Sequence, residues 1–511
     1  MTLRAFGAAF FARDDAVRPF VAPVEALDEL SASPPAAAVL HELERQNPGR
    51  THALAEPGSI AVVTGQQVGL FGGPAYSLHK ALTAVFIARA LRARGQPATP
   101  IFWLQVEDHD LHEVEGAVAL DASGAPVDLR PQRSLDVRER ISLAHRSVDK
   151  AVAASAAKLA DVIEAREHGA DVAALIRAAY TVGASYADAF RRVLDAATGE
   201  ELLFFDPRTL AVAELLRPLH VQCVERAEAL GQALAAQGES LRRAGFRVQV
   251  PIRPDCTLSF VHPEGAEGPR YRLRGFGTER ELVGGGGSNL HVDALMERAV
   301  DDPRAFSSSA LLRPALQDHL FPRAAYIAGP GEASYFAQLA PIYEELGVAR
   351  GRLIPRMRAR YLSASCRERL SQWNVQGDVA DAKSWTSTLA EASAVREEAA
   401  DLRARLANMV SGDPRDRAKA SASIEHALSG WVERTDRRLL QRTPDLQRDY
   451  QAVLQELQPL GTPQERTLCV ADRMAHFGDT LPGALDQAYE PLGAAICDID
   501  LPAPGSADHG S

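Results

Sequence analysis

Residues 60–80 read IAVVTGQQVGLFGGPAYSLHK: an apolar run, a glycine-rich stretch and then a helical pattern. The run from Ile60 to Val63 predicts a short buried strand, since its apolar residues stop at Thr64. Pro74 suits the start of a helix that the spacing extends to about Arg94. The glycines between strand and helix allow tight turns and a close approach of the backbone to a ligand: Gly65, Gly69, Gly72 and Gly73. Strand, turn and helix together predict an α/β fold that presents backbone N–H groups and a helix dipole to an anion.

The predicted helix also separates polar from apolar residues. Leu78, Leu82 and Val85 share one side, and the polar residues of the opposite side and its flank are Tyr76, His79, Lys80 and Thr83. A solvated face explains this pattern in an ordinary helix. Lysine is scarce here, with five against 51 arginines, and Lys80 lies within two turns of the expected anion site, so a binding role is the alternative.

A second strand leads into a cluster of charged residues. Residues 99–113 read TPIFWLQVEDHDLHE, with a buried strand predicted over 99–104 and then Glu107, Asp108, His109, Asp110 and Glu113. Ligands of open α/β sheets lie at the carboxyl ends of strands, which places this cluster beside the first turn. Carboxylates and an imidazole can hold a divalent cation, move protons or orient an amine, or they can simply cap the next helix. The spacing matches no zinc signature, so the identity of any metal stays unknown.

The two runs, TGQQ-x-GLF-x-GP-x-Y-x-x-x-K and FW-x-x-x-EDHD-x-x-E, resemble the cysteine-adding enzymes of bacillithiol biosynthesis, a family of cysteine ligases. Residues 311–318 (LLRPALQD) and 325–332 (AYIAGPGE) are similar to two further blocks of that family, and 463–466 (PQER) and 476–478 (HFG) to its closing segment. The sequence departs from the pattern at Ser77, where threonine is expected, and at Phe477, where tyrosine is usual.

The resemblance implies a Rossmann-like, nucleotidyltransferase-like α/β core with inserted connecting segments, and an α-helical coiled-coil arm. It also implies the activity: cysteine is joined to glucosaminyl-malate in the last step of bacillithiol biosynthesis. Such an amide forms only after the carboxylate is activated, so an ATP/ADP-type nucleotide is expected, and Mg²⁺ is compatible with the cluster. The enzyme needs donors for phosphate charge, a base for the amine and a dry site.

Roles follow for the residues of the matching blocks. The catalytic group is Lys80, His79, Asp108, His109 and Asp110, the last three orienting or deprotonating the amine. The backbone from Gly65 to Gly73, with Gln66, Gln67 and Lys80, would cradle anionic groups, and Arg313 with the turn from Gly329 to Glu332 would complete the site. The predicted substrate- and nucleotide-binding residues are Thr64, Gly65, Gln66, Gln67, Gly69, Gly72, Gly73, Tyr76, Glu107, Glu113, Arg313, Gln317, Asp318, Gly329 and Glu332.

The composition is that of a globular protein of 511 residues. A net charge of −11 argues against nucleic acid or an anionic membrane as the main partner. Five widely spaced cysteines indicate neither a disulfide framework nor a zinc site, and no segment reads as a signal peptide or a membrane span. A cytoplasmic location is therefore expected.

Three regions are predicted: a core over residues 1–370 with insertions at about 114–310, a helical hairpin over 371–460, and a return to the core with a tail over 461–511. Apolar residues at three-four spacing between Leu389 and Met409 form a seam that two helices cannot bury alone. We expect a homodimer through this arm.

Two other functions are compatible with the sequence. One is a metal-assisted hydrolase that uses the EDHD cluster, and the other is a non-catalytic, nucleotide-binding dimeric scaffold. Ordinary phosphate signatures are missing, since Gly65 is not followed by G-K-[ST] at the P-loop interval and no G-x-G-x-x-G occurs.

Overall fold

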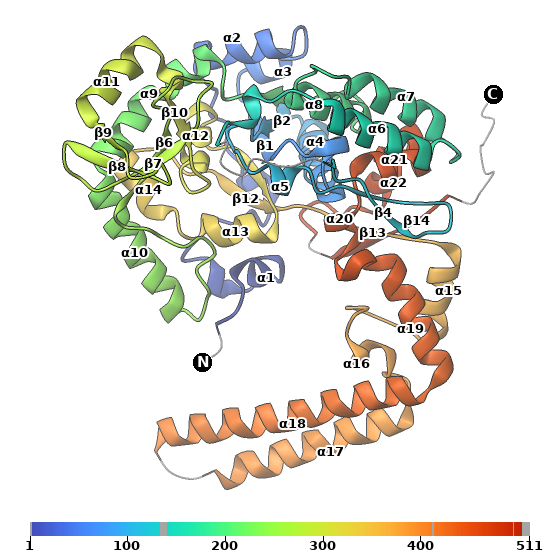
Figure 1. Cartoon of the computed structure of the whole chain (residues 1–511). Helices are drawn as coiled ribbons and strands as arrows, with labels where there is room; N and C mark the ends of the chain where they lie inside the picture. Colours follow the sequence, from blue (N-terminus) through green and yellow to red (C-terminus); the bar gives the residue numbers. More distant parts are fainter. Residues whose placement is uncertain (1–2, 133–139, 411–412, 494, 503–511) are drawn as a thin grey trace. The chain divides into compact units, whose positions relative to one another are not determined.

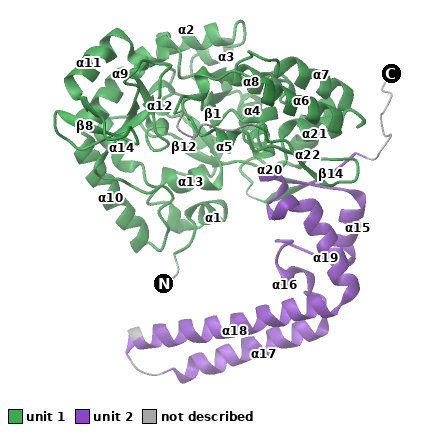
Figure 2. Ribbon diagram, viewed as in Figure 1, with its two compact units in different colours: residues 1–359, 468–497 green, residues 360–467, 498–511 purple. Residues whose placement is uncertain are grey.

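The computed structural model describes residues 3–132, 140–410, 413–493 and 495–502. The chain divides into two compact units, Met1–Ala359 with Leu468–Cys497, and Arg360–Thr467 with Asp498–Ser511 (Figure 2). The second unit thus begins about ten residues before the predicted boundary, and the return to the first unit spans 468–497 rather than the whole of 461–511. Within the described residues, no helix has both the length and the apolar character that a membrane span requires.

The first unit is built on a five-stranded parallel sheet in the order β12-β11-β1-β2-β5. Figure 1 labels β1, β2 and β12 of this sheet. Its strands are β1 (Ile60–Gln66), β2 (Ala98–Leu104), β5 (Leu203–Phe205), β11 (Ala325–Ala328) and β12 (Arg352–Pro355). The chain runs outward from β1 through β2 to β5 and then returns to the other side of β1. This is the doubly wound, Rossmann-like order, and its switch point lies between β1 and β11, where such folds bind ligands.

Helix α4 (Ala75–Ala93) follows the glycine-rich stretch, with Pro74 as its N-cap. It contacts β1, β2 and β11 as well as α8 (Tyr186–Ala197) and α21 (Val470–Phe477). The helix is therefore buried on nearly all sides, and the polar side chains of the predicted solvated face are buried too, among them His79, Lys80 and Thr83. A helix covered by sheet and helices exposes no polar face, whatever its pattern.

The segment between β2 and β11 carries the insertions. Helices α6 (Lys150–Ile163), α7 (Gly169–Ala179) and α8 precede β5, and α9 (Leu210–Glu225) and α10 (Ala227–Arg243) follow it. A second, antiparallel sheet has the order β10-β6-β7-β8-β9 and its own apolar cluster. Its strands are β6 (Cys256–Val261), β7 (Tyr271–Arg274), β8 (Glu279–Val283), β9 (Asn289–His291) and β10 (Phe306–Ser308).

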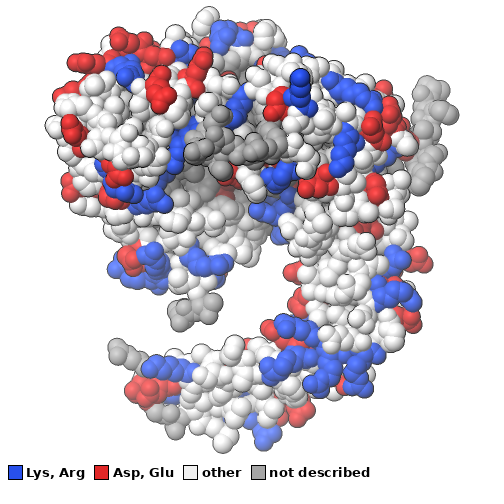
Figure 3. All heavy atoms as spheres, viewed as in Figure 1, with Lys and Arg blue, Asp and Glu red and all other residues white. Residues whose placement is uncertain are grey.

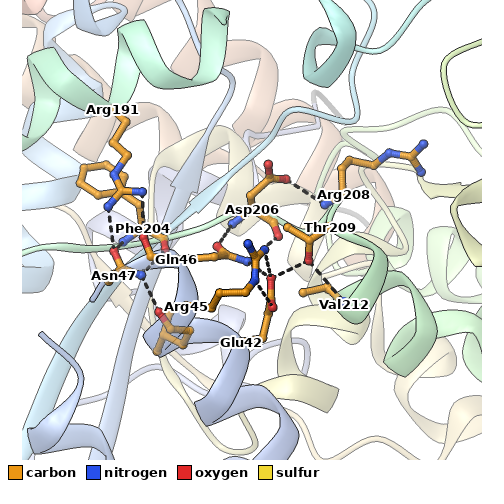
Figure 4. A network of polar contacts seen from close by, with 11 residues as sticks. Glu42, Arg45, Gln46, Asn47, Arg191, Phe204, Asp206, Arg208, Thr209 and Val212 are labelled. Carbon is orange, nitrogen blue, oxygen red and sulfur yellow. Dashed lines mark hydrogen bonds and ion pairs between the residues drawn. The ribbon is translucent and has the colours of Figure 1, made fainter. Parts of the chain in front are cut away.

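Helix α2 (Ala37–Gln46) closes the edge of the main sheet at β5 (Figure 4). The Asn47 amide donates to the carbonyl of Phe204 at 2.7 Å and accepts from its N–H at 2.8 Å, as a neighbouring strand would. An edge strand left unpaired invites association with other chains, so this side chain protects the sheet. Beside it, the buried Glu42 accepts from Arg45, Gln46 and Thr209 at 2.7–2.8 Å.

We expect Glu42 to make stability depend on acid pH. Burial raises the pKa of this carboxyl, but its hydrogen bonds outweigh burial and hold the pKa at about 2. A carboxyl with a lowered pKa stabilises the fold above its unfolded pKa of about 4.5 and loses that effect as the pH falls towards 2. Glu42→Gln should thus cost about 2–3 kcal/mol at pH 7 and almost nothing near pH 2, measured by urea unfolding. Glu56→Gln, at an exposed position, is the control, and a cost that does not shrink in acid would contradict the prediction.

The second unit contains α15 (Ala364–Gln372), α16 (Ala382–Trp385), α17 (Ala390–Met409), α18 (Pro414–Arg442) and α19 (Pro444–Leu457). Helices α17 and α18 pack against each other along their length, as the hairpin prediction requires (Figure 1). Trp385, Leu446 and Val453 belong to the apolar cluster of this unit. Residues 498–502 return to it, where Leu501 N–H donates to the Leu362 carbonyl at 2.8 Å.

Charged side chains of both signs are interspersed over each unit on the face shown in Figure 3. Many of them pair, as Arg89 does with Glu201 in the first unit and Arg403 with Glu425 in the second, each with a contact at 3.0 Å. An exposed pair such as Arg403–Glu425 contributes little stability by itself.

Candidate functional site

Lys80 lies at the switch point of the sheet. Its Nζ is 2.7 Å from Glu332 Oε2 and 3.3 Å from Gln66 Oε1, and it also donates to the carbonyl of Gly65. These three acceptors match the three protons of an ammonium group, and the side chain is only 1% exposed. Burial lowers the pKa of Lys80 to about 8, while the charge of Glu332 opposes that shift.

Glu332 is held by the turn that opens α13 (Pro330–Phe336). Its Oε2 accepts from the N–H of Gly329 at 2.9 Å, and its Oε1 accepts from the Tyr326 hydroxyl at 2.6 Å. Burial raises the pKa of this carboxyl, but the charges of Lys80 and Arg313 outweigh burial and keep the pKa below its usual value. Glu332 is therefore an ionised partner of the Lys80 ammonium.

Arg313, at the start of α12 (Arg313–Leu320), is linked to the Lys80–Glu332 pair through hydrogen bonds. Its guanidinium donates to the hydroxyls of Tyr335 at 2.8 Å and Tyr326 at 3.1 Å, and to Gln317 Oε1 at 2.9 Å. Tyr326 lies inside one of the sequence blocks that suggested the site and Tyr335 lies three residues beyond it, but neither was predicted as a site residue. A hydrogen-bonded string thus runs from Arg313 through Tyr326 and Glu332 to Lys80.

Tyr76 and Arg356 lie next to this string. The Arg356 guanidinium is 5.7 Å from the centre of the Tyr76 ring, and it also approaches Gly329, where an added Cβ would lie 3.4 Å from Arg356 Nε. Arg356 was not predicted, because it follows a strand without any local motif. The buried Arg356 guanidinium therefore lies close to Gly329 at the switch point.

Asp318 departs from its predicted role. Its Oδ2 accepts from the Tyr343 hydroxyl at 2.7 Å and from the N–H of Gly351 at 2.9 Å. Burial raises its pKa to about 6. The residue ties α12 to α14 (Ala340–Leu346) and to the turn before β12. Its contacts are those of a packing residue.

The glycine-rich stretch also differs from the expectation of a backbone anion cradle. The N–H groups of Gly69, Phe71 and Gly73 donate to Gln67 O, Tyr180 Oη and Leu70 O at 2.6–2.9 Å. Gly72 has φ +85° and packs on Val470, whose Cβ would lie 2.7 Å from an added Cβ. These amides are engaged within the chain, and the glycine at 72 serves close packing.

Thr64 and Gly65, at the start of the stretch, make close contacts with the neighbouring strands of the sheet. Thr64 Oγ1 donates to the carbonyl of Ile327 at 3.1 Å, and a Cβ on Gly65 would lie 2.7 Å from the carbonyl oxygen of Trp103. His79 is fully buried, and its carbonyl accepts from the Thr83 hydroxyl at 2.5 Å. At the carboxyl end of β1, Gln66 Nε2 lies 3.3 Å from the Tyr76 hydroxyl, and Gln67 Nε2 donates to Asp108 and Glu113.

The residues of the EDHD cluster, after the end of β2, make different contacts. Glu107 is buried and accepts from the N–H of Ser308 at 3.1 Å, which ties it to the second sheet. Asp110 is exposed and caps α5 (Leu111–Val114), where it accepts from Glu113 N–H at 3.1 Å. Between them, Asp108 Oδ2 accepts from Gln67 Nε2 at 2.7 Å.

The pKa values of Asp108 and His109 are both lower than usual. Burial raises the pKa of Asp108, but Arg270 and Gln67 outweigh it, so the pKa lies below the usual value. Burial lowers the pKa of His109, and the charge of Arg270 lowers it further. The cluster therefore presents a carboxylate beside a neutral imidazole, a pair suited to orient an amine and accept its proton.

Arg270, from the second sheet, was missed by the sequence reasoning. Its guanidinium stacks 3.9 Å from the Phe260 ring centre, and it donates to the carbonyl of Ser308 at 2.8 Å and to that of Glu107. Arg270 directly precedes β7 and carries no local motif that marks it as a site residue. The inserted sheet thus supplies the cation that shapes the electrostatics of the EDHD turn.

Gln67 joins the two runs. Its Nε2 donates to Asp108 at 2.7 Å and to Glu113 at 2.9 Å, while Gln66 Nε2 lies 3.3 Å from the Tyr76 hydroxyl and 3.5 Å from Gln67 Oε1. The strand ends of β1 and β2 therefore form one polar cluster, with Lys80 and Glu332 at one end and Asp108 and Glu113 at the other.

Two further features bear on ligands. Among the described residues, no group of three or more His, Cys, Asp or Glu side chains is arranged to hold a metal ion.

A groove of about 930 Å³ lies in the second unit between α16, α17, α18 and α19. Its buried Asp436 accepts from Arg396 at 2.6 Å and from Thr386 at 2.7 Å, so its charge is already compensated.

The cysteines lie outside the polar cluster. Cys223, Cys256, Cys366 and Cys469 are buried, and burial raises the pKa of each of these thiols, to about 12 in all but Cys256. A protonated thiol is a poor nucleophile. We expect each of five single Cys→Ala variants, including Cys497→Ala, to keep its activity. One variant that is folded but inactive would overturn this.

The sheet order and the buried polar cluster at its switch point define a Rossmann-like α/β protein with a site between β1 and β11. Residues 38–357 match the model of the N-terminal Rossmann-like domain of the bacillithiol biosynthesis protein BshC. The chain belongs to the BshC family.

Individual relatives agree. The protein named "Putative cysteine ligase BshC" from Solibacter usitatus is 36% identical over 317 residues, which is 61% of this chain and 57% of that relative. Its namesake from Salinibacter ruber is 32% identical over 322 residues, or 61% of this chain and 56% of the relative. These two matches thus span little more than half of each relative. The namesake from Koribacter versatilis is 28% identical over 495 residues, covering 90% of this chain and 85% of the relative.

Proposed function

We propose that the chain is a ligase that adds cysteine to the amine of glucosaminyl-malate in the last step of bacillithiol biosynthesis, in the cytoplasm. The amide forms through an activated carboxylate, with an ATP/ADP-type nucleotide as the activating substrate. The observation that carries the proposal is the polar cluster at the switch point, where a buried cation and a hydrogen-bonded carboxylate lie at opposite ends of one line of contacts. The family model is named for bacillithiol biosynthesis and the relatives are named as cysteine ligases, which supports cysteine as a substrate. Glucosaminyl-malate and the nucleotide follow from the resemblance of the sequence blocks.

Each end of the cluster suits one half of the reaction. Lys80, Arg313 and Arg356 are buried cations at the switch point, where Glu332 is the ionised partner of Lys80. The remaining positive charge favours an anionic carboxylate or phosphate there. Asp108, with neutral His109 beside it, orients the amine and accepts its proton. Burial strengthens the first effect, because water screens the charge of Lys80 little, whereas Asp108 is only partly buried.

A direct assay tests the proposal. Purified chain is incubated with cysteine, glucosaminyl-malate and a nucleoside triphosphate, and the thiol product is measured by mass spectrometry. Asp108→Asn, checked for folding, serves as the inactive control. Absence of product with the folded wild-type protein would refute the proposal. Loss of the cellular thiol after deletion of the gene is the matching result in the organism.

The two alternatives gain less support. Asp110 caps a helix and Glu107 binds the second sheet, so the EDHD turn offers no converging ligand set for a metal-assisted hydrolase. Mg²⁺ remains compatible with the reaction as a companion of the nucleotide, and no step here depends on it. A non-catalytic scaffold would need no paired carboxylate and imidazole at the switch point. It predicts that deleting the arm abolishes function while Asp108→Asn does not.

We also propose that the protein is a homodimer through α17 and α18. Leu402 and Leu406 are only partly buried within the single chain, although they lie on the apolar seam. Replacing both with aspartate should give monomers, because each charge placed in an apolar interface costs several kcal/mol, about 2 or more. Light scattering is the measurement, and an unchanged dimer would place the interface elsewhere.

A further inference from the structure

Gln66 and Gln67 place two amide side chains in series between Lys80 and the EDHD turn. Gln66 Oε1 lies 3.3 Å from Lys80 Nζ, Gln66 Nε2 lies 3.5 Å from Gln67 Oε1, and Gln67 Nε2 lies 2.7 Å from Asp108 Oδ2. The same Gln67 Nε2 is 2.9 Å from Glu113 Oε2. A line of polar groups therefore runs from a buried ammonium to two carboxylates.

The orientation of both amides follows from the charges at the two ends. Each amide turns its oxygen towards the cation and its N–H groups towards the carboxylates. The reverse orientation of either amide would bring N–H groups against the ammonium or the next N–H. Hydrogen bonds in series polarise one another, the more so away from water. A change at one end therefore alters the strength of the hydrogen bond at the other.

The Lys80 end has one contact that a ligand can replace. Glu332 is fixed by Gly329 and Tyr326, and the Gly65 carbonyl belongs to β1, so neither can leave without disturbing the fold. The Gln66 amide is the longest of the contacts and comes from a flexible, partly exposed side chain. An anion that binds the ammonium takes the place of Gln66 Oε1.

Displacement of Gln66 from Lys80 also changes the hydrogen bond to Asp108. Once Gln66 turns away, Gln67 Oε1 loses its neighbour and Gln67 Nε2 becomes a weaker donor. Asp108 and Glu113 then keep more of their negative charge for another partner, and an amine is the group that two carboxylates at the end of a strand would bind.

We infer that Gln66 and Gln67 couple two half-sites, one for an anionic carboxylate or phosphate at Lys80 and one for an amine at Asp108 and Glu113, so that the anion strengthens amine binding. The chemical class of the two ligands rests on the proposed function, whereas the coupling between the side chains does not. The two glutamines are positioning residues in this scheme.

A double-mutant cycle without ligand tests the coupling. Gln66→Met and Asp108→Asn alter residues that share no hydrogen bond, and hydrogen exchange of β1 and α4 amides reports the opening constant of each variant. Series coupling predicts that the double variant departs from the product of the single effects by about threefold or more, and that a Gln67→Met background removes this departure. Gln105→Met, at the same edge but outside the series, should combine with Asp108→Asn multiplicatively. If the effects of Gln66→Met and Asp108→Asn on the opening constant also combine multiplicatively, the inference is wrong.

A binding measurement separates positioning from a merely structural role. D-Glucosamine is titrated calorimetrically into the full chain with and without saturating inorganic phosphate. The wild type and Gln105→Met should bind glucosamine about fivefold more tightly with phosphate, and Gln67→Met should show equal affinities. A structural role would weaken both affinities and keep their ratio, which would overturn the inference. Wild-type protein that binds neither probe and makes no product refutes the proposed function, while the mutant cycle still decides the coupling.

Discussion

Replacing Lys80 with methionine should destabilise the first unit by about 3–5 kcal/mol, the usual cost of removing one partner of a buried ion pair. Methionine keeps the length and apolar stem of lysine, so the loss reports on charge rather than on a cavity. Glu332 would remain buried with Tyr326 and Gly329 as donors but without its 2.7 Å ammonium partner. Native-state hydrogen exchange of the β1 and α4 amides measures the change in that unit alone.

The pH dependence and a second substitution identify the cause. Without Lys80, the pKa of Glu332 should rise, because only Arg313 and the hydrogen bond from Tyr326 then oppose burial. The loss of stability should therefore shrink as the pH falls and the carboxyl takes up a proton in both proteins. Glu332→Gln added to Lys80→Met should restore part of the stability, because the double variant has no unpaired buried carboxylate at position 332. Lys158→Met, at an exposed position, should change stability by no more than about 0.5 kcal/mol. A loss independent of both pH and Glu332 would mean that Lys80 acts through packing.

Replacing Asp108 with asparagine should lower kcat by about 10²–10⁴, the usual contribution of a general base. The side chain keeps its shape, and its pKa, lowered by Arg270 and Gln67 against burial, marks the carboxylate as ionised at neutral pH. The sequence alone placed Asp110 in this role as well. In the structure Asp110 is an exposed helix cap, and asparagine caps helices equally well, so Asp110→Asn should change kcat by less than about threefold.

Both variants are compared in the ligase assay at equal folded fraction. Equal and large losses would mean that the turn acts as a unit and that the exposed cap contacts substrate. A large loss for Asp110→Asn alone would assign the base to Asp110. Loss of activity that tracks a lowered melting temperature in Asp108→Asn would leave Asp108 only a structural role.

Local sequence patterns were sufficient for the framework of the site. The apolar run at 60–63, the helix after Pro74 and the strand at 99–104 all appear within a few residues of their predicted bounds. The rule that parallel strands carry ligands at their carboxyl ends then placed Lys80 near Asp108. The family blocks added Arg313, Gly329 and Glu332, which the structure brings to the same switch point. Each of these inferences needs only residues that are close in the chain or a rule of sheet topology.

Only the tertiary structure decided what each group does there. The α4 face that carries Lys80 is buried against Gly65 and Gln66 at the end of β1 and against Glu332 of α13, and no helical period reveals such a cover. The same long-range packing occupies Gly72 with Val470 and Asp318 with Tyr343, and it brings Arg270 from an inserted sheet to the EDHD turn. A sequence lists the charged groups, but the pKa and the free hydrogen-bond capacity of each depend on neighbours that only folding supplies.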